Sequence, residues 1–223
     1  MRYAIYQYDN DNKSRCLVRI AKILPDERGV VEIRIIKVYV DDSGNGLFTY
    51  LQKTGKPMNA SLKYLHPIQE VLISIRPEWC AKIASGQKTV EVRKTAPKCG
   101  TPFLCRIYCT EPNTTDPKRL LETHNYEDGH IYRANGKVCA EFICDEIIDI
   151  WPGYAKGDDC LTYEQQESYL GPNGHGYGWR ISNLEIYPIP KELSVYGIKK
   201  APQSWIYLQP VIIPARNLTK NQF

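Results

Sequence analysis

The chain has 223 residues, of which 43% are hydrophobic, and 29 basic against 25 acidic side chains give it a formal net charge of +4. This length allows one sizeable domain or two small ones, and we interpret it as two. No run has the apolar length that spans a bilayer, and the N-terminal residues lack the apolar core of a signal peptide. The sequence therefore predicts a cytoplasmic protein without a membrane partner.

The charged side chains are unevenly distributed along the chain. Residues 71–110 hold seven basic and two acidic side chains, whereas residues 111–180 hold six basic and thirteen acidic ones. A local basic cluster beside an acidic region suits a defined anionic ligand better than a long, uniform track along duplex DNA.

The eight cysteines are scattered, mostly inside strand-like runs such as FLCRIYC and VCAEFIC. In a reducing compartment, such cysteines behave as small buried hydrophobic residues. A metal site formed by a cysteine pair and a histidine is the alternative, but the chain has no C-x-x-C pair. Cysteines four apart on a strand also span more than the reach of one tetrahedral ion. We predict no metal and no cofactor.

Residues 1–68 predict a small β domain, compatible with an SH3-like barrel. The run PDERG joins two of its strands, and the run DDSGNG ends the third strand. A boundary follows at residues 66–67, so that residues 69–223 form the second domain. The expected elements of the first domain are strands at 3–8, 16–24 and 30–40, a short helix at 47–53 and a final strand at 62–65.

The second domain is expected to begin with a strand at 71–75 and a helix that starts at Pro77 and stops at Gly86. Proline suits the first helical position, and glycine suits the left-handed position that closes a helix. Within this helix, Trp79 and Ile83 are four residues apart, as are Cys80 and Ala84, so one side of it is predicted to lie against a core.

After this helix, the sequence period changes to two. Val90 and Val92 alternate with Glu91 and Arg93, which predicts a half-buried strand with a charged face. Glu91 and Arg93 then point to the same side, roughly 7 Å apart along the strand. Lys88 lies in the turn before the strand, where the alternation does not fix its direction.

The remainder of the chain predicts a closed or nearly closed barrel of five or six strands with two short helices. Thr162 is a candidate N-cap for the second helix. The glycine-rich run GPNGHGYGW can approach a ligand closely, although no G-K-[ST] follows it as in a phosphate loop. We expect strands at 103–110, 137–150, 179–187 and 204–208, a helix at 162–170, and a long connection at 111–135 with one helical turn at 118–122.

Gly86, Lys88, Glu91 and Arg93, placed after a proline-initiated helix, resemble the signature of ASCH domains, which are relatives of the PUA fold. The similarity continues through GKVCAEFICDEI, TYEQQESYL, YGWRISNLEIY and APQSWIYL. It covers about residues 71–209 and leaves the first 70 residues unassigned. The resemblance implies a PUA-like β-barrel, mainly β with short helices.

The resemblance also implies that the face beside the motif strand is a cleft for RNA, a modified base or a nucleotide. In this interpretation, Arg93 binds a phosphate or carboxylate through two parallel hydrogen bonds, and Lys88 supplies a movable point charge. Arg76 is a further ligand-binding candidate. An exposed charged strand face without function is the alternative, because such faces are common.

Aromatic side chains near the motif are candidates for stacking on a base. Tyr177 and Trp179 are our candidates for this role, with Trp205 as a further ring. The alternative is that these rings belong to the core, which is where aromatic residues in small barrels usually lie.

A hydrolase is the second function that the motif allows, with Lys88 and Glu91 as catalytic residues. The resemblance extends to some relatives that are amidohydrolases of acylated cytidines. These relatives use a lysine, a threonine three positions further on and a distant glutamate. Here the third position is Glu91, which departs from that pattern, and Glu141 or Glu146 would have to supply the distant acid. Ribonuclease activity is the other form of this hypothesis. A protein-interaction module is the third class, with a protein partner docking on the N-terminal domain.

Overall fold

A computed structural model describes residues 3–7, 14–23, 29–43, 46–111, 121–153, 158–171 and 174–209. The chain divides between Ile68 and Gln69 into two compact units. Whether each unit folds on its own stays a prediction. Among the described residues, no helix is long and apolar enough to cross a membrane.

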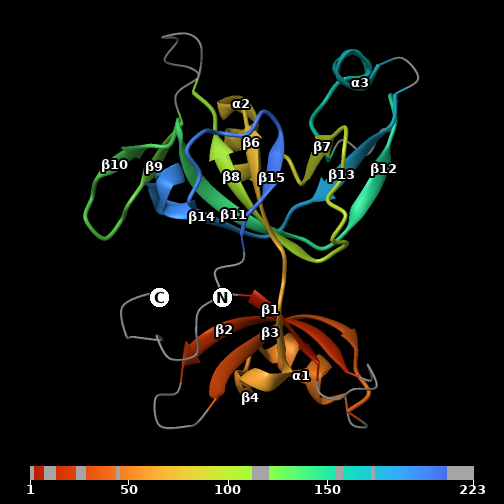
Figure 1. The fold of residues 1–223 in the computed structure, drawn as a ribbon, viewed down its shortest axis with the longest axis vertical. Helices are drawn as coiled ribbons and strands as arrows, with labels where there is room; N and C mark the ends of the chain where they lie inside the picture. The colour runs from red at the N-terminus through yellow and green to blue at the C-terminus, as the bar shows by residue number, and fades with distance from the viewer. Residues whose placement is uncertain are drawn as a thin grey trace. The chain divides into compact units, whose positions relative to one another are not determined.

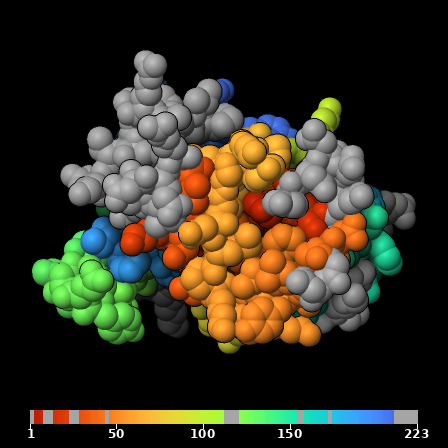
Figure 2. Space-filling view, turned by 90° about the horizontal axis from the view of Figure 1, so that it is seen from below, coloured from red at the N-terminus to blue at the C-terminus, as the bar shows by residue number. Residues whose placement is uncertain are grey.

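The first unit is a five-stranded antiparallel sheet with strand order β4-β3-β2-β1-β5. In Figure 2 the orange segment, which includes α1 and β4, forms much of the visible face of this unit. Its elements are β1 (Tyr3–Gln7), β2 (Arg15–Ile23), β3 (Val30–Val40), α1 (Leu47–Thr54), β4 (Met58–Ser61), the 3-10 helix η1 (Leu62–Tyr64) and β5 (Leu65–Pro67).

The helix predicted at 47–53 is confirmed, and its start shows why it forms. Gly46 precedes the helix with a left-handed φ of 66° and provides no side-chain cap. Instead, the Asp41 carboxylate accepts hydrogen bonds from the backbone N–H and the hydroxyl of Thr49, at 2.9 and 2.7 Å. The Ser43 hydroxyl accepts from the N–H of Leu47 at 2.9 Å. The DDS part of the loop therefore caps α1.

The strand predicted at 62–65 is wrong. Residues 62–64 form η1, and the two short strands β4 and β5 lie on either side of it. The predicted strand spans a tight turn, since β4 pairs with β3 while β5 pairs with β1. The SH3-like assignment of this unit stays a prediction.

The second unit contains ten of the strands found in the described part of the chain, not five or six. Its elements are β6 (Glu70–Ile75), α2 (Pro77–Ala84), β7 (Val90–Arg93), β8 (Phe103–Cys109), β9 (Glu122–His124), β10 (Ile131–Arg133), β11 (Lys137–Cys144), β12 (Ile147–Ile150), α3 (Tyr163–Leu170), β13 (Gly176–Arg180), β14 (Ser182–Lys191), the 3-10 helix η3 (Leu193–Tyr196) and β15 (Trp205–Tyr207).

Two sheets form the body of this unit. One has the order β14-β11-β8-β6-β15 and the other the order β12-β13-β7, while β9 and β10 make a separate hairpin. Together they make a curled half-barrel (Figure 1), where the sequence predicted a closed or nearly closed barrel. The prediction of a mainly β fold with short helices is confirmed.

Two runs that were predicted as single strands each divide and pass from one sheet to the other. The run at 137–150 becomes β11 and β12, and the run at 179–187 falls on β13 and β14. Asp145 explains both breaks, because its carboxylate accepts from Arg180 Nε at 2.9 Å and from the Ser182 hydroxyl at 2.8 Å. One side chain thus ties the two crossing points together.

The segment predicted as a long connection contains the hairpin of β9 and β10. Residues 118–120 of the helical turn predicted there lie outside the described residues, and Glu122 begins a strand. A strand of three residues is too short to show a period, which is why the sequence did not predict it.

The predicted helix between Pro77 and Gly86 is confirmed as α2. Gly86 has a φ of 74°, which suits the end of a helix. The helix lies on the connection between β6 and β8, which are parallel and therefore need a crossover. Cys80 and Ile83 are buried against the core formed by β6, β8 and β11, whereas Ala84 is exposed.

Candidate functional site

A cavity of about 1100 Å³ opens in the second unit beside β7. The first turn of α2, the strand β7, the helix α3 and residues 201–204 before β15 contribute to its lining. Of the site residues predicted from sequence, Lys88, Glu91, Arg93 and Arg76 all line this cavity. The structure therefore brings these four residues to one concave surface.

Lys88, Glu91 and Arg93 form a continuous chain of charges. Lys88 Nζ lies 3.4 Å from Glu91 Oε2, and Arg93 Nη2 lies 2.9 Å from Glu91 Oε1. The three residues are only 3%, 6% and 8% exposed. The alternative of an exposed strand face is therefore wrong, since an exposed pair would be screened by water whereas this one is largely removed from it.

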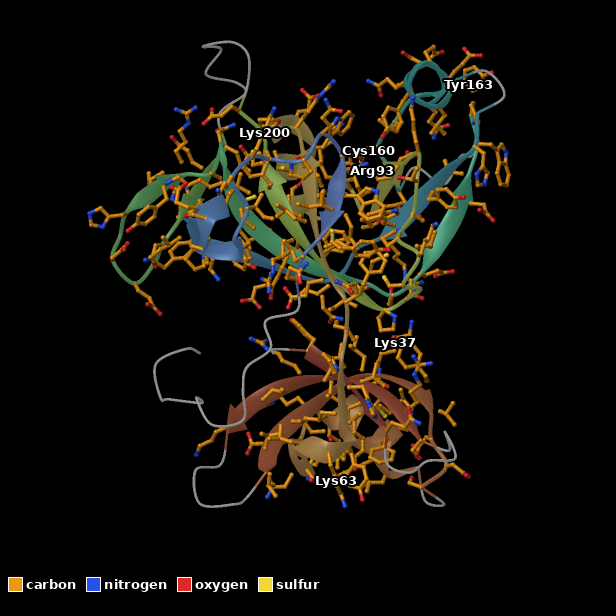
Figure 3. All side chains as sticks on the ribbon, in the orientation of Figure 1. Lys37, Lys63, Arg93, Cys160, Tyr163 and Lys200 are labelled. Carbon is orange, nitrogen blue, oxygen red and sulfur yellow. The ribbon has the colours of Figure 1, made fainter. Side chains whose placement is uncertain are left out.

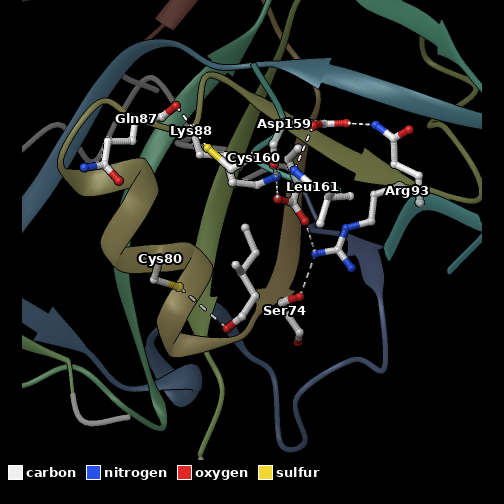
Figure 4. Close-up of polar contacts among 11 residues, drawn as sticks. Ser74, Cys80, Gln87, Lys88, Arg93, Asp159, Cys160 and Leu161 are labelled. Carbon is white, nitrogen blue, oxygen red and sulfur yellow. Dashed lines mark hydrogen bonds and ion pairs between the residues drawn. The ribbon is translucent and has the colours of Figure 1, made fainter. Parts of the chain in front are cut away.

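Both cations of this chain also donate to a backbone carbonyl. Lys88 Nζ donates to the oxygen of Asp159 at 2.6 Å, and Arg93 Nη2 donates to the oxygen of Ser74 on β6 at 2.7 Å. Figure 4 shows both contacts, and Figure 3 shows the Arg93 side chain inside the second unit. These bonds fix the two cationic groups on either side of the glutamate.

Two polar atoms of Lys88, Glu91 and Arg93 lack a hydrogen-bond partner among the described residues. They are Arg93 Nε and Glu91 Oε2, whose contact with Lys88 Nζ is a 3.4 Å ion pair without hydrogen-bond geometry. A buried polar atom without a partner costs about 1–3 kcal/mol. The Glu91 oxygen belongs to a side chain that lines the cavity, so a ligand that donates a hydrogen bond there would remove this cost.

The packing of β7 explains why its charged face is turned inward. Val90 and Val92 are buried in a small apolar cluster with Ile150, against which Leu170 of α3 packs. The other face of the strand carries Glu91 and Arg93 toward β6, as the Arg93 bond to the Ser74 oxygen shows. The sequence period located the two faces of β7 but not which one faced the half-barrel.

The helix α3 is confirmed with the predicted cap. The Thr162 hydroxyl accepts from the backbone N–H of Gln165, and the Gln165 side chain accepts from the N–H of Thr162. Gln165, Ser168 and Tyr169 line the cavity, and sequence analysis missed all three. Only the packing of α3 near β7 would have identified them, and this packing is a tertiary feature.

Two glycines of the run GPNGHGYGW serve packing. A Cβ at Gly176 would lie 2.6 Å from a methyl group of Leu170, and one at Gly178 would lie 2.7 Å from a methyl group of Val90. Both glycines are buried inside β13. They allow α3, β7 and β12 to pack closely on this strand, and neither lines the cavity.

The cavity has a mixed lining and is not the basic cleft that the sequence predicted. The clustered cations of residues 71–110 meet Glu78 and Glu91 from the same segment, and Glu111 and Glu164 from beyond it. Within the described ranges, three cationic side chains, Arg76, Lys88 and Arg93, line it together with four carboxylates, Glu78, Glu91, Glu111 and Glu164.

The aromatic candidates do not line the cavity. Trp179 is fully buried, where it packs edge-on against Phe103 and Trp205 with ring centroids 5.2 and 5.6 Å apart. Tyr177 packs against the same core. Trp205 donates from Nε1 to the Thr95 hydroxyl at 3.1 Å. Their strand positions place these rings in or against the core, so a stacking role for them has no geometric support.

Two other rings do line the cavity, Trp79 of α2 and Tyr169 of α3. The ammonium group of Lys88 lies 5.3 Å from the Trp79 ring centroid, and that of Lys94 lies 5.3 Å from the Tyr169 centroid. Each ring therefore attracts a cation through its face. One ring lies on α2, directly before β7, and the other lies on α3, far along the chain. Both were missed as ligand candidates.

Glu141 and Glu146, the candidates for a distant acid, lie elsewhere. Glu141 is buried on β11, where Arg106 Nη1 approaches its Oε2 to 2.5 Å. Glu146 forms an ion pair with Arg180. Neither glutamate lines the cavity, so neither is available to act with Lys88 there.

The eight cysteines are all free, and six of them are buried. Burial raises the pKa of the Cys105 thiol well above its usual value, and that of Cys144 to about 12. These thiols stay protonated at neutral pH, so they are poor metal ligands. Within the described ranges, no group of three or more His, Cys, Asp or Glu side chains is arranged to hold a metal ion.

No family model matches the chain, and no curated protein matches it. Among solved structures, the chain is similar to ASCH from Zymomonas mobilis, at 21% identity and a TM-score of 0.47, over 63% of this chain and 88% of that one. Two mutants of the Zymomonas protein match at 20% identity, with TM-scores of 0.46 and 0.47, over 63% of this chain and 91% and 89% of theirs. These structures bear the family name that the motif at residues 86–93 indicated. A likeness at this level carries neither an activity nor the role of any residue.

Proposed function

We propose that the cavity binds a single unstacked nucleotide, either free or within single-stranded RNA, and that the protein is a binding module. The observation that supports this is the buried chain of Lys88, Glu91 and Arg93 beside a cavity of about 1100 Å³. A cavity of this size accommodates a nucleoside. Its polar groups are held in place before any ligand arrives, which lowers the entropic cost of binding.

The polar edge of the base would contact Glu91. Its Oε2 atom has no hydrogen-bond donor among the described residues, and Lys88 Nζ stands 3.4 Å away. An acceptor beside a donor matches the edge of a nucleobase, on which N–H and carbonyl or ring-nitrogen groups alternate. Trp79 or Tyr169 would then stack on the face of the base.

The mixed charge of the lining indicates which part of the nucleotide is inserted. Among the residues that the structure describes, three cations face four carboxylates, so this part of the lining has no excess of positive charge for a chain of phosphates. The base and sugar would therefore occupy the cavity, with the phosphate at its rim. Arg76 is exposed and lines the cavity, and Lys94 lies against Tyr169. These two cations are the expected phosphate contacts.

Fluorescence anisotropy with a labelled single-stranded RNA of about ten nucleotides tests this function. We expect binding that weakens as salt concentration rises, because counterions are released from the phosphates. Arg93→Ala should weaken binding about tenfold or more, since it removes a charge-assisted contact and frees Glu91. Lys137→Ala is the matched control, because Lys137 is a surface cation paired with Glu192 outside the cavity. Binding that ignores both salt and Arg93 would contradict the proposal.

A hydrolase is the second candidate, and the pairing of Lys88 with Glu91 is the observation that favours it. Glu91 Oε2 could accept a proton from a water molecule in the cavity, with Lys88 beside the leaving group. Incubation with an RNA and an acyl-nucleoside panel tests this candidate by product release. Glu91→Gln should abolish turnover, and a variant as active as the parent would remove Glu91 from such a mechanism.

A further inference from the structure

The position of the Lys88 ammonium group depends on a loop far away in sequence. Lys88 lies between α2 and β7, outside both elements. Its Nζ atom donates to the carbonyl oxygen of Asp159 at 2.6 Å. The loop is also bound to the start of β7, because the N–H groups of Thr89 and Val90 both donate to the Asp158 oxygen, at 2.8 and 2.9 Å. The direction that sequence alternation left open is therefore set by residues 158–159.

The Asp159 carboxylate holds this carbonyl in place. Asp159 is only 3% exposed. Its Oδ1 atom accepts from the N–H of Leu161 at 2.9 Å, and its Oδ2 atom accepts from Gln166 Nε2 at 2.8 Å. Charge-assisted hydrogen bonds of this kind are stronger than bonds between neutral groups. A buried carboxylate that loses one of them carries the desolvation cost uncompensated.

Gln166 connects the same loop to α3. It is the buried residue of that helix, at 3% exposure, among side chains that are mostly polar and exposed. Its Oε1 atom also accepts from the N–H of Gly153 at 2.9 Å. Because α3 has only a weak apolar face, this polar contact and the packing of Leu170 together dock the helix. The docked helix presents Tyr169 to the cavity.

The backbone next to Asp159 is held in an uncommon conformation. Cys160 has a φ of 58°, in the left-handed region that side chains other than glycine rarely adopt. Its thiol donates to the oxygen of Gln87, immediately before Lys88, at 3.2 Å. A residue in this conformation persists when the surrounding contacts over-determine it. Here those contacts join Cys160 to Gln87 and Asp158 to Thr89, on the two sides of Lys88 along the backbone, and Figure 4 shows the contact between Cys160 and Gln87.

We propose that Asp159 and Gln166 are a pair of positioning residues that set the Lys88 ammonium group and the α3 wall as one unit. Neither side chain lines the cavity, so each acts through another group. The significance of the pair for binding rests on the function proposed above. Its effect on Lys88 does not, because the contacts are made between groups of the protein itself.

An exchange of the two functional groups tests this proposal. In Asp159→Asn, the asparagine oxygen accepts from Leu161 and the Gln166 oxygen accepts from Gly153, so two NH2 donors face each other. In Gln166→Glu, two carboxylates face each other. The double variant Asp159→Asn with Gln166→Glu keeps the net charge and restores one donor facing one acceptor. The introduced asparagine still accepts from Leu161, and the introduced glutamate still accepts from Gly153. Glu167→Gln serves as a control for a charge change on α3, because Glu167 lies outside the cavity lining.

The readout is the rate at which a lysine-acylating reagent labels Lys88, measured by mass spectrometry on the full chain. We expect labelling of Lys88 about tenfold faster in each single variant, from the loss of a buried charge-assisted contact, and a return to within about twofold of the parent rate in the double variant. RNA affinity should fall and return in the same order. Circular dichroism establishes which variants are folded.

Each outcome separates the two proposals. Folded single variants with the parent labelling rate would overturn the positioning role. If the single variants fail to fold, the double variant decides: parent-like labelling supports the role, and fast labelling in a folded double variant overturns it. If labelling follows the expected order while the parent binds no RNA, the positioning role stands and the proposed function fails.

Discussion

The second unit contains two buried charge networks of similar composition in different surroundings. In one, Arg106 on β8 donates from Nε to Glu70 at 2.9 Å and from Nη1 to Tyr187 at 2.8 Å, and Nη1 also contacts Glu141. In the other, Lys88 and Arg93 flank Glu91. The first network is buried with the core side chains of β11 and β14, whereas the second faces a cavity of about 1100 Å³.

The difference lies in how many polar atoms have partners. The three guanidinium nitrogens of Arg106 contact Glu70 Oε2, Glu141 Oε2 and the Tyr187 hydroxyl. In the cavity network, Glu91 Oε2 and Arg93 Nε have no hydrogen-bond partner among the described residues. Burial of charge alone therefore does not identify a binding site. A buried network beside a cavity, with hydrogen-bonding capacity left over, is the better criterion.

The largest effect on stability is expected from the network of Arg106, Glu70, Glu141 and Tyr187. Arg106→Leu would leave the buried Glu141 carboxylate without its cation, and removal of one partner from a buried pair costs about 3–5 kcal/mol. Urea denaturation should show this loss in the free energy of unfolding, while RNA affinity of the folded protein changes little. Arg133→Leu is the matched control, because its pair with Glu111 is more than half exposed on both sides and should contribute less than about 1 kcal/mol. Equal losses for both variants would remove the contrast.

The cavity network should show the opposite balance. Glu91→Gln keeps the shape of the side chain but removes the charge between Lys88 and Arg93, so we expect RNA affinity to fall about tenfold or more. The free energy of unfolding should fall by only about 1–2 kcal/mol, because each cation keeps its bond to a backbone carbonyl and faces the cavity. Anisotropy and urea denaturation on the same samples measure both quantities. A stability loss as large as that of Arg106→Leu, without a loss of affinity, would make this network structural too.

The aromatic walls should contribute a smaller part of the affinity. Tyr169→Ser removes a ring that lines the cavity, and stacking of one base on an aromatic side chain contributes about 1–3 kcal/mol. We therefore expect at least about a fivefold loss of RNA affinity with little change in unfolding. Tyr126→Ser is the control, because Tyr126 is 96% exposed and lies outside this cavity. If the two variants bind alike, the base does not stack on Tyr169.

The smallest effect is expected in the first unit, where the Asp41 carboxylate is held by hydrogen bonds from Ser43 and Thr49. Partial burial raises the pKa of Asp41, but hydrogen bonds from Ser43 and Thr49 outweigh it and lower this pKa to about 2, from a usual 3.8. Since the folded pKa is the lower one, the stabilisation is complete above about pH 4 and is lost as the pH falls toward 2.

Asp41→Ala should remove this pH-dependent component and cost about 1 kcal/mol at neutral pH, as for other helix caps. Urea denaturation of the parent and the variant at several pH values between 2 and 7 measures the difference. The gap between the two should close as the pH falls. A constant gap would show that Asp41 acts through packing and not through its charge.

Capping residues and local hydrophobic periodicity predicted the elements that position the site. Pro77 and Gly86 defined α2, Thr162 defined the start of α3, and the alternation at residues 90–93 defined β7. These features depend on neighbours a few residues apart, which a single sequence contains. Lys88, Glu91 and Arg93 were candidates from this alternation and from the resemblance to ASCH domains, and all three line the cavity.

Features that depend on distant contacts were missed or misassigned. Nothing near Tyr169 indicates that α3 packs across β7, and nothing near Asp159 indicates that its carbonyl receives Lys88. Glu111 and Glu164 of the cavity lie outside residues 71–110, so the count of charges over that segment predicted a basic cleft. Trp179 was a ligand candidate because aromatic residues serve both cores and stacking, and only tertiary packing distinguishes the two roles.

A crystal structure of the chain soaked with nucleoside monophosphates tests the central claim most directly. We predict an ordered nucleoside in the cavity, with an N–H of the base within hydrogen-bond distance of Glu91 Oε2 and the ring against Trp79 or Tyr169. A nucleotide bound elsewhere on the chain, with the Lys88, Glu91 and Arg93 cavity empty, would contradict the account.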